Sequence, residues 1–207
     1  MSKPLPGRQG QAARNNQVIL AAARDVFLAD AKAPIAAVAE RAGVGISALY
    51  RRYAGKEDLL RTLCHDGLRQ FIAEAEAAAA EPDGWAAFVG FLQRVVEADV
   101  HSLTVHLAGT FTPTAEMHGD ATRADALVRK LFARARASGR LRRDAVVHDV
   151  TLVLEGCAAV RVPDPARTKQ LRQRFLGVLL AGLAEGSEAL PGPPPKPGEL
   201  SWRWQGR

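Results

Sequence analysis

Five histidines and two cysteines are the side chains of this chain that could bind a metal ion or act as nucleophiles. His101 and His106 are the closest histidine pair, but a spacing of five residues places them about 140° apart around a helix, so they cannot share a face as metal ligands do. Cys64 and Cys157 are too few for a disulfide framework, which fits a reducing compartment. Because phosphate-binding glycine loops and nucleophile elbows are also missing, we expect no enzyme, no metal site and no cofactor.

Phosphate binding by basic side chains is the chemistry that the charge distribution favours. The formal net charge is +6. Residues 1–56 hold nine bases and three acids, whereas residues 57–207 hold 19 of each. A basic quarter joined to a neutral remainder indicates one part that meets a polyanion and another part with a different task.

The elements that would position these bases are two short helices over about residues 34–53. Pro34 suits the first turn of the first helix, because its missing N–H has no helical partner there. Gly43 can end this helix, since glycine adopts a left-handed backbone without strain. A second short helix would begin at Ile46 and carry the basic residues that follow it. This spacing is typical of a DNA-binding helix-turn-helix.

The segment VAERAGVGISALYRRYAGKEDLL resembles the signature of TetR-family transcriptional regulators, and the likeness in motif covers about residues 15–65. The resemblance implies that Tyr50 and Lys56 contact DNA phosphates. Lys56 also opens a helix, where free N–H groups favour a phosphate. The recognition helix would present its start and outer face to the major groove, and an arginine there could pair with guanine O6 and N7. The further candidates for base and backbone contacts are Gly45, Ile46, Ser47, Arg51 and Arg52.

The chain as a whole is predicted to be all-α, because helix-forming residues dominate and no stretch alternates with the period of a strand. We expect an N-terminal three-helix DNA-binding domain that a long helix joins to a helical ligand-binding and dimerisation domain. The expected helices cover about residues 15–29, 34–42, 46–53, 56–81, 83–106, 122–138, 145–160 and 165–185. The expected divisions are a flexible basic arm (1–13), the DNA-binding domain (14–58), the regulatory domain (59–188) and a Pro-rich tail (189–207).

Homodimerisation is expected because one helix-turn-helix reads only a short half-site, so two copies on a palindrome supply the affinity. The last two helices carry apolar and small residues at helical spacing, and the resemblance implies a four-helix dimer interface built from them. The alternative is that these stripes face only their own subunit's core. The candidate interface residues are Val150, Leu154, Leu171, Phe175, Val178 and Gly182.

A ligand pocket is the expected task of the neutral domain, since the resemblance implies small-molecule effectors. We expect apolar walls with a few polar groups that fix the ligand. The alternative for each aromatic residue is a place in the packed core. The candidate pocket residues are Trp85, Phe88, Phe91, Leu92, His106, Phe111, Met117, Thr151 and Glu155.

The resulting hypothesis is a repressor that binds a palindromic double-stranded DNA operator as a homodimer and is released by a largely apolar small molecule. The alternative is a nucleic-acid-binding adaptor or structural protein without an effector. No apolar stretch approaches the roughly 18 residues that cross a bilayer, and no secretory signal is evident, so we expect a cytoplasmic protein with no membrane partner.

Overall fold

The computed structural model describes residues 6–184, 186 and 188–200, and for residues 6–13 the backbone alone. The described part is helical and has no named strand, which confirms the predicted fold class. The helices are α1 (Pro6–Ala29), α2 (Ile35–Ala42), α3 (Ile46–Tyr50), α4 (Lys56–Ala79), α5 (Gly84–Glu97), α6 (Val100–Leu107), α7 (Ala115–Ala137), α8 (Asp149–Ala159) and α9 (Pro165–Leu183).

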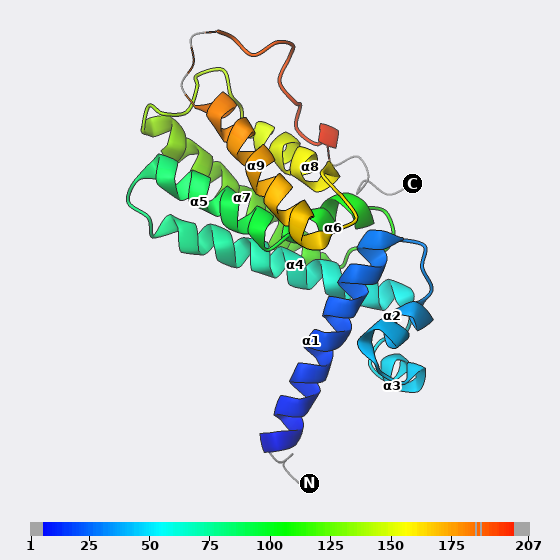
Figure 1. The fold of residues 1–207 in the computed structure, drawn as a ribbon. Coiled ribbons are helices and arrows are strands. Elements are labelled where there is room, and N and C mark those ends of the chain that lie inside the picture. The colour runs from blue at the N-terminus through cyan, green and yellow to red at the C-terminus, as the bar shows by residue number, and fades with distance from the viewer. Residues whose placement is uncertain (1–5, 185, 187, 201–207) are drawn as a thin grey trace.

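The helices divide into two groups that α4 connects. Figure 1 shows α2 and α3 beside α1 at one end of the molecule, and α5, α7, α8 and α9 packed together at the other. The long α4 packs against α1 as well as against α5, α6 and α7. A displacement of α4 therefore acts on both groups.

Two apolar cores hold the two groups. The first is built from buried residues of α1 to α4, and its remaining members are Leu103, Leu107, Phe111 and Met117, which come from α6 to α7. The second core surrounds α5, which packs between α4, α7 and α9. The N-terminal core is thus completed by residues that lie far along the chain from residues 14–58.

Helix α1 begins earlier than the sequence suggests. The expected cap at residues 15–16 is absent, because the helix runs on from Pro6. Asn16 instead accepts a hydrogen bond from the Tyr53 hydroxyl, with 2.6 Å between the oxygens. The expected flexible arm is therefore helical from Pro6, while residues 1–5 lie outside the described residues.

The helix expected over residues 83–106 is broken at Asp99, whose φ of 56° is left-handed. Arg24 of α1 donates hydrogen bonds to the carbonyls of Ala98 and Asp99. Arg172 of α9 approaches the Asp99 carboxylate at 2.5 Å. These tertiary contacts stabilise a backbone turn that apolar periodicity does not reveal, since aspartate visits the left-handed region at modest cost.

The later helices also differ from the prediction at their ends. Helix α7 starts at Ala115 because the Thr114 hydroxyl accepts a hydrogen bond from the Met117 N–H at 3.2 Å. Beyond α9, the chain is irregular, as expected for a Pro-rich tail. The Leu190 N–H donates to Asp144 at 2.7 Å and so fixes the start of this tail. Residues 201–207 lie outside the described part.

Candidate nucleic-acid interface and ligand cavity

The turn between α2 and α3 is set by Gly43. Its φ of 64° and ψ of 30° lie in the left-handed region. The Val44 N–H then bonds to the Ala39 carbonyl at 3.0 Å and closes the turn. Helix α3 ends at Tyr50, earlier than the predicted Tyr53, but the Tyr53 N–H still bonds to the Leu49 carbonyl at 2.9 Å. One further helical turn therefore carries the two arginines that follow α3.

The second helix of this motif has one buried and one open face. Leu49 and Tyr53 are buried in the N-terminal core. Tyr50 is 53% exposed, and the remaining candidates on this helix point outward with it. The exposed candidates are Gly45, Ile46, Ser47, Tyr50, Arg51 and Arg52. The predicted contact residues thus share one open surface, which we call the recognition surface.

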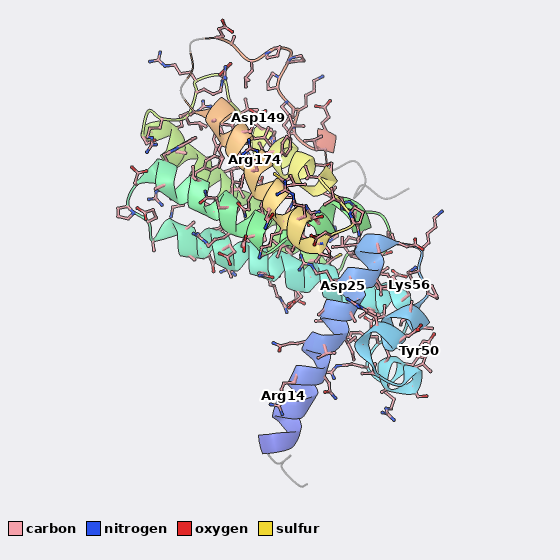
Figure 2. All side chains as sticks on the ribbon, viewed as in Figure 1. Arg14, Asp25, Tyr50, Lys56, Asp149 and Arg174 are labelled. Carbon is pink, nitrogen blue, oxygen red and sulfur yellow. The ribbon has the colours of Figure 1, made fainter. Side chains whose placement is uncertain are left out.

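Lys56 stands beside this surface, at the start of α4. Its Nζ lies 5.3 Å from the centroid of the Phe27 ring, a cation–π contact that orients the ammonium. No side chain caps the N-terminus of α4. Figure 2 shows Tyr50 and Lys56 on neighbouring elements, with Arg14 on α1 at the same end of the molecule.

The recognition surface is electropositive. Within the described residues, neither Arg51 nor Arg52 has a carboxylate within 4.0 Å. The Asp58 carboxylate points to the loop before α4, where it accepts a hydrogen bond from the Ala54 N–H at 3.0 Å. Burial raises the pKa of Tyr53, so its hydroxyl stays neutral and donates to Asn16. Charge and exposure together suit this surface to a polyanion.

A partly open cavity of about 290 Å³ lies between α4, α6, α7 and α8, and we call it the α4–α8 cavity. Its walls come from α4, α6, α7 and the start and body of α8, and Leu200 of the tail also lines it. Most of the lining is apolar. The lining residues are Gly67, Leu68, Phe71, Val100, His101, Thr104, Val105, Ala121, Ala124, Asp125, Val128, Val147, His148, Val150, Thr151, Leu154, Glu155 and Leu200.

Two of the predicted pocket residues, Thr151 and Glu155, line this cavity. Four others do not, and the prediction for them is corrected. The side chains of Trp85, Phe88, Phe91 and Leu92 are buried in the second core because α5 is covered by three helices. These four large side chains fill the space between α5 and its neighbours, whereas the cavity lies between α4, α6, α7 and α8. Helical spacing of Val100, Thr104 and Val105 in α6 is the signal that could have found this wall.

The remaining pocket candidates lie elsewhere. His106 lines a separate, polar cleft of about 450 Å³ between α1, α2, α6 and α9. Met117 borders a hollow of about 290 Å³ that shares Leu68, Thr104 and Ala121 with the α4–α8 cavity. Phe111 is buried in the N-terminal core, because the connector after α6 folds back against α4. None of these three side chains lines the α4–α8 cavity with Thr151 and Glu155, although Met117 borders the hollow next to it.

The outward face of α8 and α9 is the surface available to a second copy. On α9, Val178 is 62% exposed and Phe175 is half-buried, so the α9 candidates share one open face with Gly182 and Leu171. On α8 the prediction selected the wrong face, since Val150 and Leu154 point inward and line the cavity.

The exposed residues of α8 are Thr151, Leu152, which is 51% exposed, and Ala159, while Gly156 is half-buried against α9. A Cβ on Gly156 would stand 3.1 Å from the Phe175 ring of α9. The glycine therefore allows the two helices to cross closely. This small residue is the sequence signal for the helix crossing.

The cysteines and histidines show no catalytic grouping. Both cysteines are buried and free, and burial raises the pKa of Cys64 to about 12 and that of Cys157 to about 11. Such thiols are poor nucleophiles. Among the residues that the structure describes, no three His, Cys, Asp or Glu side chains stand close enough to hold a metal ion. None of the described helices has the length and apolar character needed to cross a bilayer.

Comparisons with known proteins agree with this architecture. Residues 19–63 match the family model for bacterial regulatory proteins of the tetR family, and residues 83–185 match the model for the C-terminal domain of SbtR-like transcriptional regulators. No curated relative matches the chain.

Solved structures share the fold. A TetR regulator from Streptomyces coelicolor is 23% identical, with a TM-score of 0.59 over 83% of this chain and 99% of that one. The TetR-like regulator LfrR from Mycobacterium smegmatis, solved with proflavine, is 22% identical, with a TM-score of 0.60 over 86% of this chain and 99% of that one. With both of its parts matched by models of one family, the chain belongs to the TetR family of transcriptional regulators.

Proposed function

We propose that this protein is a cytoplasmic repressor that binds a palindromic DNA operator as a homodimer and is released when a small molecule fills the α4–α8 cavity. The observation that carries the DNA-binding part is the recognition surface, because the buried Leu49 and Tyr53 fix a helix whose open face ends in two exposed arginines. A helix of this kind inserts its start and outer face into the major groove.

A salt titration tests this part. Operator DNA is first selected from random duplexes by the purified protein, and its affinity is then measured by fluorescence anisotropy at several salt concentrations. Lys56→Gln is expected to lower the salt slope by about one per protomer, hence about two for the dimer, because each lysine neutralises one phosphate. Lys130→Gln, an exposed lysine on α7, is the matched control and should leave the slope unchanged. Equal slopes for the two variants would contradict the proposed role of Lys56.

Homodimerisation is proposed through the outward face of α8 and α9. Exposed apolar side chains such as Val178 and Leu152 lose contact with water when two copies pair. Gly177 and Gly182 are exposed on the same helix and permit close approach of backbones. The pairing would place two recognition surfaces at a fixed separation, as a palindrome requires.

The effector part distinguishes this proposal from an adaptor or structural protein that only binds nucleic acid. A partly open cavity of about 290 Å³ with mostly apolar walls favours a sensor. Solved structures of the same fold include LfrR with proflavine and FadR from Bacillus subtilis with stearoyl-CoA. An adaptor would need no such space.

The route from cavity to DNA runs through two helices. Helix α4 lines the cavity at Leu68 and Phe71 and begins at Lys56 on the DNA side. Helix α6 forms the opposite wall, and Arg24 of α1 binds the backbone at its start. A ligand that binds one arrangement of α4 and α6 more tightly than the other shifts the equilibrium toward that arrangement. The recognition surface then takes a different position, and the affinity for the operator changes.

A further inference from the structure

The Asp99 carboxylate is the meeting point of arginines from both groups of helices. Arg24 of α1 donates hydrogen bonds to the carbonyls of Ala98 and Asp99, and its guanidinium lies 3.8 Å from the Asp99 carboxylate. Arg172 of α9 approaches the same carboxylate at 2.5 Å. Along the part of the chain that the structure describes, no other carboxylate lies within 4.0 Å of either arginine. Asp99 is therefore a shared partner of α1 and α9.

Arg172 also binds the end of α8 at this point. Its guanidinium donates to the Val160 carbonyl at 3.0 Å and to the Ala158 carbonyl at 3.3 Å. The Arg172 side chain is buried, and a buried charge that loses its partners is costly. This guanidinium therefore holds α8, α9 and the turn before α6 in one arrangement.

Polar contacts join α1 to α9, although the two helices pack mainly against different neighbours. Helix α1 packs against α2, α4 and α6, whereas α9 packs against α5 and α8. Arg161, in the turn before α9, adds a further contact by donating to the Leu28 carbonyl near the end of α1. Apolar burial has no preferred direction, whereas a hydrogen bond to a charged group also fixes geometry. The contacts at Asp99 are therefore suited to set the position of α1 relative to α9.

We propose that Asp99 is a positioning residue for operator binding, which fixes the separation of the two recognition surfaces in the dimer and so selects the spacing of the half-sites. The inference rests on the proposed function, because it needs a homodimer that pairs through α8 and α9 and reads a palindrome. In that dimer α9 lies at the two-fold axis, and α1 packs against α2 of the helix-turn-helix. A link between α9 and α1 then sets where each recognition surface meets the DNA.

Asparagine at position 99 separates the charge from the backbone conformation. Asparagine tolerates the left-handed φ of 56° that this position has, and its side chain has nearly the same shape as that of aspartate. It lacks the negative charge that Arg24 and Arg172 share. Asp99→Asn is therefore expected to keep the turn and to weaken the link. Asp125→Asn is the matched control, because Asp125 pairs with Arg129 at 2.7 Å within the single helix α7.

The experiment compares two operators that differ only in spacing. The operator selected from random duplexes is measured by fluorescence anisotropy beside a derivative with one base pair inserted at its centre. The insertion moves the half-sites about 3.4 Å further apart and rotates one by about 35° relative to the other. We expect the wild-type protein to bind the lengthened operator at least about tenfold more weakly, and Asp99→Asn to narrow this ratio to about threefold or less. A loss of folded protein lowers binding to both operators alike, so the ratio measures positioning and not stability.

Asp125→Asn should keep the wild-type ratio. A ratio that Asp99→Asn leaves unchanged, or that both variants narrow equally, would overturn the role of Asp99. If Asp99→Asn does not fold, Arg24→Gln removes the α1 side of the link and decides by the same ratio, which must narrow for the proposal to stand. If the wild-type protein selects no palindrome or binds both operators equally, the proposed dimer on a palindrome fails, which is a different result from a fixed spacing that Asp99 does not set.

Discussion

Gly43 allows a clean measurement of how much the helix-turn-helix depends on one backbone angle. It has a φ of 64°, and a Cβ built there would meet no atom within 4 Å. The cost of Gly43→Ala therefore comes from the backbone alone, not from a clash. A left-handed conformation costs an L-residue about 1–2 kcal/mol, so we expect the free energy of unfolding to fall by about that amount.

Gly45 is the matched control. A Cβ on this glycine would also stand in open space, but its φ is −65°. Gly45→Ala should change the free energy of unfolding by less than about 0.5 kcal/mol, since a small capping penalty is offset by a stiffer unfolded chain. Gly43→Asn should recover part of the loss from Gly43→Ala, because asparagine tolerates the left-handed region better than alanine.

Urea unfolding followed by circular dichroism measures these differences at one fixed protomer concentration, because pairing of the proposed dimer would make the stability depend on concentration. If Gly43→Ala and Gly45→Ala unfold at the same urea concentration, the left-handed turn is not what stabilises the motif. A loss well above the expected range would also refute the reasoning, because it would require a steric contact that the structure lacks.

Three further outcomes are expected. Gly84→Ala should lower the free energy of unfolding by about 1–3 kcal/mol in the same assay. The alanine Cβ would clash with the Arg134 carbonyl oxygen and push α5 away from α7. Burial lowers the His101 pKa from 6.5 to about 4, so the unfolded chain binds a proton at a higher pH than the folded chain does. The free energy of unfolding should therefore fall by about 2 kcal/mol between pH 7 and pH 5. His101→Gln should lose that part of the pH dependence, whereas His118→Gln, which changes an exposed histidine, should keep it. The same pH profile for the two variants would refute the role of His101. Val178→Glu should give a folded monomer by sedimentation, because it buries charge in the proposed interface, and a persistent dimer would exclude that face.

The helix-turn-helix was predictable because its determinants are local. Gly43 ends one helix, Leu49 anchors the next, and the exposed residues lie between fixed points only a few positions apart. The same holds for α9, where Asp164 caps the helix by accepting from the Ala166 N–H at 2.9 Å. Signals that act within one turn can be read from the sequence alone.

The cavity was harder to predict because it depends on contacts between distant segments. Apolar periodicity marks the side chains that fill a core, such as Phe88 and Phe91, and carries no sign of where packing leaves a space. The break at Asp99 is likewise fixed by Arg24 and Arg172, which lie 75 and 73 residues away in the chain. Long-range contacts of this kind have no local signature.

The shared N-terminal core limits how this regulator can be recombined. Leu103, Leu107, Phe111 and Met117 complete the packing around α1 to α4, although they belong to the segment from α6 to the start of α7. A fragment ending at residue 58 would expose the apolar side chains that they cover. A chimaera that joins α1 to α4 to the C-terminal part of another protein would therefore also need α6 and the start of α7 to keep the N-terminal core covered.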